Sequence, residues 1–478
     1  MITRKKFIQA SGMIGAGLLL RQTKTFALTP QYFESKRPPV SGRKFKSSAV
    51  EQEITRVKKL INDPELAWLF ENCYPNTLDT TVDFVTNYGK PDTYVITGDI
   101  DAMWLRDSSA QVWPYLSLVK QDDHLQKLIQ GVINRQVICI HRDRYANAFY
   151  KDDNKMSEWK TDVTEMKPGV HERKWEVDSL CYPVRLAHQY WKLTGNQEPF
   201  DAAWEESISL IVKTFREQQR KHDQGPYTFQ RTTSWATDGV PLSGYGYPIK
   251  PVGLICSMFR PSDDATIYPF LVPSNFFAVV SLRQAAEMVH KISNNSNLAN
   301  ECERLATEVE SALRQYAIVQ HKMFGKIYAY EVNGFGSFNL MDDANVPSLL
   351  SLPYLNALHS NDITYLTTRK FVLSGSNPFF FKGTDGEGIG GPHAGMDMIW
   401  PLSIIMRGLT SNDEPEISHC IQMLVHSNAD TGFMHESFNK NDVKNFTRKW
   451  FAWANTLFGE FIIKVANTYP ALLKNKFS

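Results

Sequence analysis

The 478-residue chain lacks most of the short motifs that would assign a reaction directly. Its six cysteines contain no C-x-x-C pair, and its twelve histidines form neither an H-E-x-x-H sequence nor a cysteine and histidine cluster with zinc spacing. It also has no G-x-S-x-G sequence of the kind that carries a nucleophilic serine. We therefore predict no metal ion and no other cofactor. A hydrolytic reaction in this chain would have to depend on carboxyl groups.

The chain also lacks an excess of charge and a long apolar run. Lys and Arg number 52 and Asp and Glu 51, a formal charge of +1, so no bulk field would attract nucleic acid or an anionic membrane. After the N-terminus no uninterrupted apolar stretch could span a bilayer, and we expect no stable membrane insertion of the mature protein. Aromatic residues make up 12% of the chain and occur near polar residues in predicted loops as well as in apolar stripes. A neutral ligand with apolar faces, such as a sugar, fits this composition.

The first 27 residues have the layout of a bacterial export signal. Three basic residues, Arg4 to Lys6, precede the apolar run Met13 to Leu20, and Thr25 to Ala27 form a small-residue cleavage site. The basic residues also match a twin-arginine signal loosely, with Lys in the second basic position. We expect residues 1–27 to be removed and residues 28–478 to form one exported, periplasmic domain. An ordinary N-terminal helix is the alternative.

Apolar residues at helical spacing predict about twelve helices and few strands. Short links, such as residues 121–122 and 359–360, favour antiparallel helix pairs, and only residues 227–231 and 326–332 have strand patterns. About six helical hairpins predict an all-α fold, an (α/α)6 toroid with minor β-hairpins in its loops; a two-domain helical protein is the alternative. The predicted helices span residues 55–73, 106–120, 125–137, 177–194, 200–215, 274–292, 297–317, 342–358, 361–373, 395–409, 414–427 and 448–469.

A dense polar cluster lies between Thr97 and Ser109. Its Trp104 offers a flat apolar face to a sugar ring, while Arg106 and Asp107 offer donors and acceptors to neighbouring hydroxyls. A capped helix start would also explain Asp107, but it leaves Trp104 without a role. We therefore favour a sugar-binding cluster.

Two further loops carry carboxyl groups. In the first, Arg260 is followed by Asp263 and Asp264, one of which could be a general acid while the other holds a sugar hydroxyl. In the second, His435 stands beside Glu436, which could orient a water molecule. Breaking a glycosidic bond needs one carboxyl group to protonate the departing oxygen and another to activate water or attack the sugar. A solvated turn and a surface ion pair are the respective alternatives.

The segment Gly386 to Gly391 formally satisfies G-x-G-x-x-G. A dinucleotide site would need this sequence inside a βαβ unit, and the surrounding pattern predicts helical hairpins instead. We interpret the glycines as positions where the backbone can approach a ligand, with His393 and Asp397 at the rim of the following helix. A second acid pair, at Asp342 and Asp343, is assigned to capping of a helix start.

Together, the segments GDIDAMWLRDSSAQ, FRPSDDA, GTDGEGIGGPHAGMD and GFMHESF resemble glycoside hydrolase family 125, the metal-independent exo-acting α-1,6-mannosidases. The resemblance runs from about Val57 to Tyr469. It implies an (α/α)6 catalytic domain that binds a mannose-containing oligosaccharide or glycan and removes terminal mannose by an inverting single displacement. It places the general acid on an aspartate of PSDD, for which we take Asp263, and the general base on Glu436. The residues assigned to substrate binding are Trp104, Arg106, Asp107, Arg260, Asp264, His393, Asp397 and His435.

Two alternatives remain open at this point. One is an exported glycan-binding protein that uses the same aromatic and acidic residues without catalysis. The other is a glycosidase of the same fold with another linkage preference. Inversion would need the two carboxyl groups about 6.5 to 9.5 Å apart, whereas a retaining pair stands about 5 to 5.5 Å apart.

Overall fold

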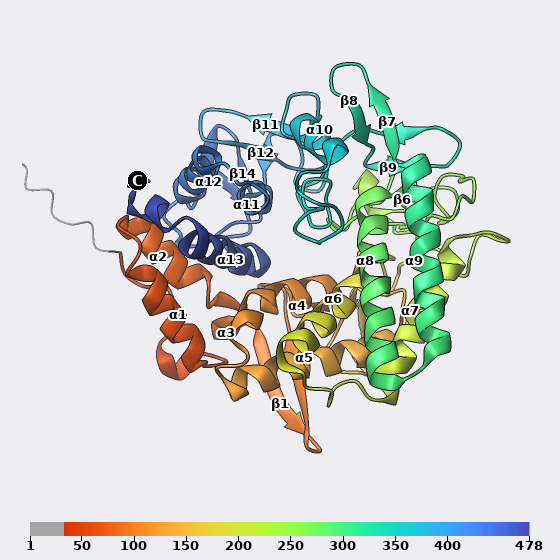
Figure 1. Cartoon of the computed structure of the whole chain (residues 1–478), viewed down its shortest axis with the longest axis horizontal. Coiled ribbons are helices and arrows are strands. Elements are labelled where there is room, and N and C mark those ends of the chain that lie inside the picture. The colour runs from red at the N-terminus through yellow and green to blue at the C-terminus, as the bar shows by residue number, and fades with distance from the viewer. Residues whose placement is uncertain (1–32, 478) are drawn as a thin grey trace, which may run out of the picture. The chain divides into compact units, whose positions relative to one another are not determined.

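The helices alternate along the chain between an outer and an inner layer, and both layers close into a ring (Figure 1). The computed structural model describes residues 33–477, and the predicted export signal at residues 1–27 lies outside them. The outer layer contains α2 (Pro64–Cys73), α5 (Asp123–Arg142), α7 (Ala202–Gln218), α9 (Ser296–Tyr316), α10 (Ile363–Val372) and α12 (Glu414–His426). The inner layer contains α4 (Leu105–Val112), α6 (Val177–Thr194), α8 (Val272–Met288), α11 (Pro401–Leu409) and α13 (Ala452–Thr468).

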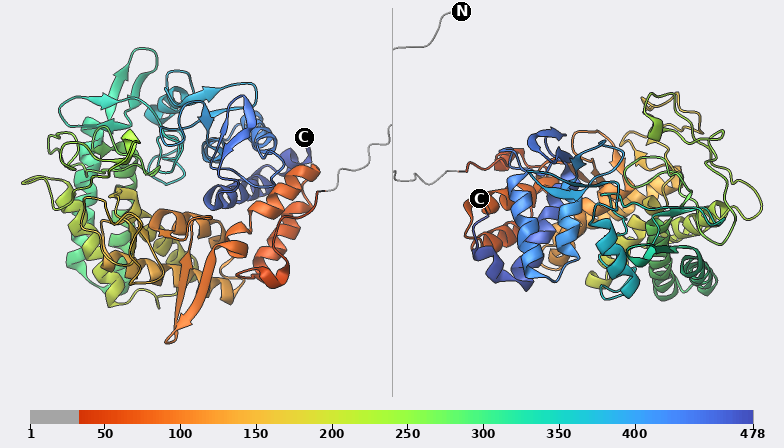
Figure 2. Two further views of the ribbon diagram at one scale, coloured as in Figure 1. Left: turned by 180° about the vertical axis from the view of Figure 1, so that it is seen from behind. Right: turned by 90° about the horizontal axis from the view of Figure 1, so that it is seen from above.

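Contacts between helices that are distant in sequence close both layers. In the inner layer α4 packs on α6, α6 on α8, and α11 on α13, which returns to α4. In the outer layer α12 packs on α2, which is preceded by α1 (Ser48–Lys58) and followed by the short α3 (Asn76–Thr80). The same ring is seen from behind in Figure 2 (left). The (α/α)6 toroid predicted from the sequence is therefore confirmed.

Short antiparallel strands decorate the connections between helices. The predicted strand region 326–332 contains two of them, whereas residues 227–231 form only a single bridge between Gln230 and Val163. The strands pair as β1 (Val82–Asn87) with β2 (Lys90–Val95), β3 (Met103–Trp104) with β4 (Ala148–Phe149) and β5 (Val170–Glu172), β6 (Phe270–Leu271) with β9 (Glu331–Val332) and β10 (Phe338–Asn339), β7 (Ile318–His321) with β8 (Gly325–Tyr328), β11 (Phe380–Lys382) with β12 (Glu387–Ile389), and β13 (Met398–Ile399) with β14 (Ser437–Asn439) and β15 (Asp442–Thr447).

The prediction of a helix over residues 342–358 is wrong. This segment forms buried turns, yet it comes between the outer helices α9 and α10, where the alternation calls for an inner element. Pro347 and Pro353 lack the N–H donors that a helix needs. The Asp342 carboxylate instead accepts two backbone N–H groups of the segment, at 2.8 and 3.0 Å, and the Tyr182 hydroxyl of α6 donates to one of its carbonyl oxygens at 2.8 Å. Side chains thus satisfy three buried backbone groups of this non-helical inner element.

The predicted helix over residues 55–73 is also wrong, because the chain forms two helices there, α1 and α2. Asp63 caps the second helix by accepting the backbone N–H of Leu66 at 2.9 Å. Pro64 fits the first position of that helix, where a missing N–H costs nothing. The Asp63 cap and the proline that follows it therefore start a second helix, although the apolar pattern continues through both helices.

The state of the cysteines and the length and hydrophobicity of the helices can be compared with the sequence predictions. All six cysteines are buried and free. Among the helices of residues 33–477, none is both long and apolar enough to cross a membrane. The long connections rise at one end of the helices, as the yellow-green segment between α7 and α8 shows in Figure 2 (right).

Candidate active site

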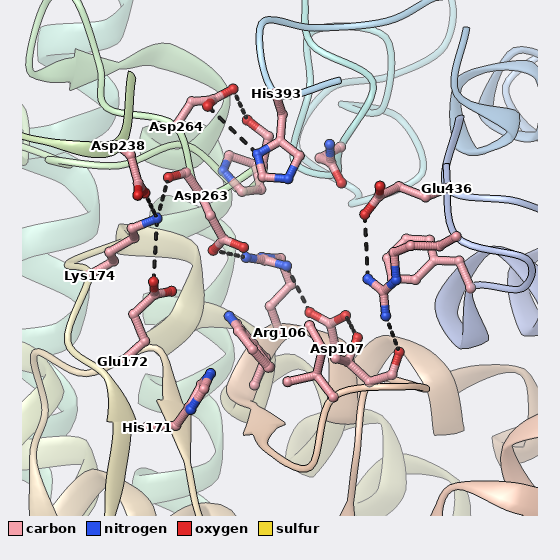
Figure 3. A pocket seen from close by; sticks show the side chains of 18 of the residues that line it. Arg106, Asp107, His171, Glu172, Lys174, Asp238, Asp263, Asp264, His393 and Glu436 are labelled. Atoms are coloured by element: carbon pink, nitrogen blue, oxygen red, sulfur yellow. Dashed lines mark hydrogen bonds and ion pairs between the residues drawn. The ribbon is translucent and has the colours of Figure 1, made fainter. Parts of the chain in front are cut away.

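Four inner helices begin beside one cavity of about 480 Å³ (Figure 3). The residues directly before these helices are Trp104, Glu176, Trp400 and Phe451, and none of them caps its helix with its side chain. Small polar residues usually occupy this position. Three of the four, Trp104, Trp400 and Phe451, line the cavity instead. The positions that normally serve helix capping here supply the walls of a site.

The adjacent residues Asp263 and Asp264 differ in their surroundings. Asp263 has a positive φ of 67°, and its Oδ1 accepts hydrogen bonds from Arg106 Nη2 at 3.1 Å and Asn147 Nδ2 at 3.2 Å. Its side chain is 24% exposed, whereas that of Asp264 is 2% exposed and accepts a hydrogen bond from the Thr237 hydroxyl at 2.7 Å. Asp263 is therefore the member of the pair that is open to a ligand.

Arg106, at the start of α4, is buried and is surrounded by four carboxyl groups. Its Nη1 donates to Asp107 at 2.7 Å, and its Nη2 donates to Glu176 at 3.2 Å as well as to Asp263. Its Nε lies 3.4 Å from a carboxylate oxygen of Asp178. A planar guanidinium with several fixed donors suits such multiple pairing, and it holds the first turns of α4 and α6 against the acidic loop.

A second buried cation, Lys174, lies on the other side of Asp263 (Figure 3). Its ammonium group donates to Asp238 at 2.6 Å and to the backbone oxygen of Asp263 at 2.9 Å, and it lies 3.4 Å from Glu172. Arg231 pairs with both Asp238 and Glu172 at 3.1 and 3.0 Å. This network joins the segment before α6 to the long connection between α7 and α8, and it fixes the loop that carries Asp263.

The carboxyl groups around Arg106 have pKa values shifted in opposite directions. Burial raises the pKa of Glu176 well above its usual range and that of Asp178 to about 6. Burial alone would also raise the pKa of Asp263, but the charges of Arg106 and Lys174 lower it to about 2. Burial thus favours the protonated form of Glu176, whereas the two cations beside Asp263 favour its anion.

The opposite wall of the cavity carries Glu436, directly before β14 (Figure 3). Its Oε1 accepts a hydrogen bond from Arg448 Nη1 at 3.4 Å, and its side chain is 12% exposed. His393 lies 3.6 Å from Asp264. Burial would lower the pKa of His393, but the contact with Asp264 and the other nearby carboxylates raise the value to about 9. A cationic imidazole thus stands between the two acidic loops.

Three residues that the sequence assigned to substrate binding do not line this cavity. Arg260 is buried and donates to Glu331 at 2.7 Å. Asp397 lies in the loop after β12 and pairs with Lys440 at 2.7 Å. His435 is fully buried and stacks on Phe446 with ring centroids 3.8 Å apart. Each has a partner that explains it, so we leave all three out of the site. The predicted residues that do line the cavity are Trp104, Arg106, Asp107, Asp263, Asp264, His393 and Glu436.

The glycine-rich segment packs against protein rather than against the cavity. Gly388 and Gly390 belong to or follow β12, which pairs antiparallel with β11 and is not part of a βαβ unit. A Cβ atom at Gly390 would stand 2.1 Å from the backbone oxygen of Met398. The glycines do allow a close approach of the backbone, as predicted. The neighbour that they approach is a strand, however, and not the predicted ligand.

Sequence reasoning missed several residues of the cavity. The run HERKWE directly before α6 supplies Glu172 and Lys174 to the cavity lining, and Glu176 to the Arg106 cluster behind it. The density of charged residues just before a predicted helix was the available signal. Asp238 and Arg448 had no such signal, because neither lies in a segment that the sequence motifs singled out. The other lining residues not predicted are Thr97, Ile100, Trp159, His171, Arg231, Trp235, Pro261, Ser262, Asn345, Trp400 and Phe451.

Comparison with known proteins identifies relatives that are similar to this chain in sequence and in fold. The meiotically up-regulated gene 157 protein of Schizosaccharomyces pombe is 41% identical over 471 residues, which cover 95% of this chain and 92% of that protein. A Streptococcus pneumoniae structure, from work on widely distributed metal-independent α-mannosidases, is a non-productive substrate complex with α-1,6-mannobiose. It has a TM-score of 0.86 and 38% identity, and it covers 89% of this chain and 100% of that one.

A more distant structure agrees in fold alone. A bacterial glucoamylase in complex with acarbose has a TM-score of 0.51 and 12% identity, and covers 90% of this chain and 57% of that one. The family model described as metal-independent alpha-mannosidase (GH125) matches residues 63–463. The chain therefore belongs to the GH125 family of metal-independent α-mannosidases.

Proposed function

We propose that this mannosidase removes terminal mannose from α-1,6 linkages, acts from the chain end and inverts the anomeric centre. Asp263 is the general acid and Glu436 the general base. The observation that supports this assignment best is that both side chains line one cavity, although they come from loops far apart in the sequence. The mannobiose complex of the Streptococcus pneumoniae relative supports the choice of linkage.

The chemistry follows from the two carboxyl groups. Asp263 gives a proton to the glycosidic oxygen as its bond to C1 breaks, and Glu436 takes a proton from the water that attacks C1 from the other side. One mannose and a shortened glycan leave, and no covalent bond to the protein forms. Two groups on opposite walls suit this reaction because the sugar and the water must both fit between them.

The sugar would be held by groups that have no other partner. The indole N–H groups of Trp104 and Trp400 are buried at the cavity, and neither donates a hydrogen bond to a residue between 33 and 477. Sugar hydroxyls can satisfy both, and the rings can pack on apolar sugar faces. We further propose that Asp107, Asp264 and His393 contact sugar hydroxyls. Residues 1–27 would direct the protein to the periplasm, where residues 28–478 act as one catalytic domain.

The decisive experiment is hydrolysis of α-1,6-mannobiose followed by NMR from the first seconds, because it reports linkage and anomeric outcome together. We expect β-mannose to appear first. Asp263→Asn and Glu436→Gln should each lower the rate by about 10²- to 10⁴-fold, the usual contribution of a general acid or base. Asp122→Asn, the same kind of change at the cap of α5 outside the cavity, should retain full activity.

Other outcomes would redirect the proposal. Retained mannobiose binding without any released mannose would point to a glycan-binding protein. Faster hydrolysis of another mannobiose linkage, or of another glycoside in a panel of disaccharides, would replace the α-1,6 assignment. Early α-mannose would contradict inversion.

A further inference from the structure

Glu176 and Asp263 share two hydrogen-bond donors, Arg106 and Asn147. Arg106 Nη2 donates to Glu176 Oε1 at 3.2 Å and to Asp263 Oδ1 at 3.1 Å. Asn147 Nδ2 likewise reaches Glu176 Oε1 at 3.4 Å and Asp263 Oδ1 at 3.2 Å. Oxygens that share two donors lie close together, and the pKa of Glu176 is raised while that of Asp263 is lowered, as expected for two carboxyl groups that share one proton. A shared proton removes the repulsion between two anions at such a short separation.

The burial of the two groups fixes where this proton rests. The Glu176 side chain is 0% exposed and accepts the Ser179 hydroxyl at 2.7 Å, whereas the Asp263 side chain is open to the cavity. The charged form of a carboxyl group costs most where water is absent. The free protein therefore has the wrong partner protonated for catalysis, because a general acid must carry its proton when the glycosidic bond breaks.

The geometry points to Glu176 as the proton store of Asp263, a positioning residue that acts through the general acid and does not touch the substrate. This inference rests on the function proposed above. A bound sugar covers the exposed side of Asp263 and removes water from it, which makes the anion of Asp263 costlier and draws the proton across their shared hydrogen bond. Glu176 is left as an anion beside Arg106, which already contacts it.

The proton balance closes over one turnover. The proton passes from Glu176 to Asp263 and from Asp263 to the glycosidic oxygen, while Glu436 receives one proton from the attacking water. After the products leave, Glu436 releases its proton to solvent and Glu176 takes one up. The charged or titratable groups that face the pair are Arg106 and Asp107 from α4, His171 from β5, Lys174 from the segment before α6, Asp178 from α6, and His393 from the loop after β12.

The test compares two substrates of the Glu176→Gln variant. Glutamine keeps the shape and can hydrogen-bond to Asp263, but it cannot supply a proton. With natural mannobiose the leaving sugar oxygen must be protonated. With 2,4-dinitrophenyl α-mannoside the leaving group is 2,4-dinitrophenolate, a stable anion that departs without acid assistance. We expect kcat/KM for mannobiose to fall by about 10²- to 10⁴-fold, as for loss of general acid catalysis, and that for the dinitrophenyl substrate by less than about tenfold. The alkaline limb of the pH profile for mannobiose should move to lower pH by about two units or more, because Asp263 then stands alone beside two cations.

Two further variants make the result interpretable. Asp263→Asn should show the same selectivity between the two substrates, since it removes the acid itself. Glu460→Gln replaces a partly buried glutamate on α13, which accepts the Tyr354 hydroxyl at 2.9 Å and whose pKa burial also raises. It reports the effect of losing such a carboxyl group away from the cavity, and we expect the ratio of the two activities to remain that of the wild type.

The outcomes separate this inference from the proposed function. If wild type hydrolyses mannobiose and Asp263→Asn is selectively impaired, but Glu176→Gln retains the wild-type pH profile, the proton store is refuted while the function stands. Equal loss of both substrates in folded Glu176→Gln would likewise refute it and leave Glu176 a purely structural role. If Asp263→Asn itself shows no preference between substrates, the assignment of the general acid fails.

Discussion

Replacement of Arg260 by methionine would separate a structural role from a sugar-binding one. The Arg260 side chain is 2% exposed, and its Nε lies 2.7 Å from Glu331, whose side chain is fully buried. Removing one partner of a buried ion pair costs about 3–5 kcal/mol, because the remaining charge is left uncompensated. Glu331 keeps hydrogen bonds from the backbone N–H groups of Ile267 and Tyr268 and from Asn339. We therefore expect a loss near the lower limit, about 3 kcal/mol.

The assay is urea unfolding of Arg260→Met, of Glu331→Gln and of the double variant, together with KM for mannobiose under conditions where each variant is folded. Methionine can still pack on the Tyr330 ring that Arg260 covers. The double variant should recover more than half of the lost stability, since neither charge remains. KM should stay within about twofold of the wild type. A stability loss below about 1 kcal/mol combined with a large rise in KM would refute this reasoning and return Arg260 to the sugar-binding residues.

Two further predictions concern charge and metal. His393 should titrate by NMR with a pKa of about 9, above the usual histidine value of 6.5, and Asp264→Asn should lower that value; a wild-type pKa near 6.5 would contradict the contact. Because the pKa is raised on folding, the stabilisation from this contact is complete below pH 6.5 and is lost as the pH rises through about 9. Mannobiose hydrolysis should be unchanged after dialysis against EDTA, as the family description implies, and a loss that added Ca²⁺ restores would contradict it.

Helix spacing predicted the fold because each layer of the toroid buries one apolar face. The helix predicted over residues 177–194 coincides with α6, and most others differ at their ends by a few residues. The failures have local causes. Asp63 and Pro64 start a new helix inside one apolar stripe, and in residues 342–358 two prolines remove N–H donors while the Asp342 carboxylate accepts backbone N–H groups in place of helical carbonyls. Periodicity reports which residues are buried, and it does not report how their backbone groups are satisfied.

Motifs predicted the site less completely than periodicity predicted the fold. Residues that stand inside a recognisable motif, such as Arg106 and Glu436, line the cavity. Motif membership also selected Asp397 and His435, which have the right chemistry but project elsewhere. In a loop the direction of a side chain depends on backbone angles, as the positive φ of Asp263 illustrates, and these angles depend on long-range contacts such as that between Lys174 and the Asp263 carbonyl.

The different roles of the two catalytic candidates follow from neighbours that no acid motif contains. Asp263 shares the donors of a second carboxyl group, Glu176, the proton store proposed above, whereas Glu436 accepts a hydrogen bond from the permanently charged Arg448. The first arrangement suits a group that must donate, and the second suits one that must be an anion before it accepts. Glu176 precedes α6 directly, and Arg448 lies just before α13. In the proposed mechanism the neighbours that distinguish acid from base come from the starts of two inner helices, and exchanging these neighbours, rather than the carboxyl groups themselves, should be enough to disable either role.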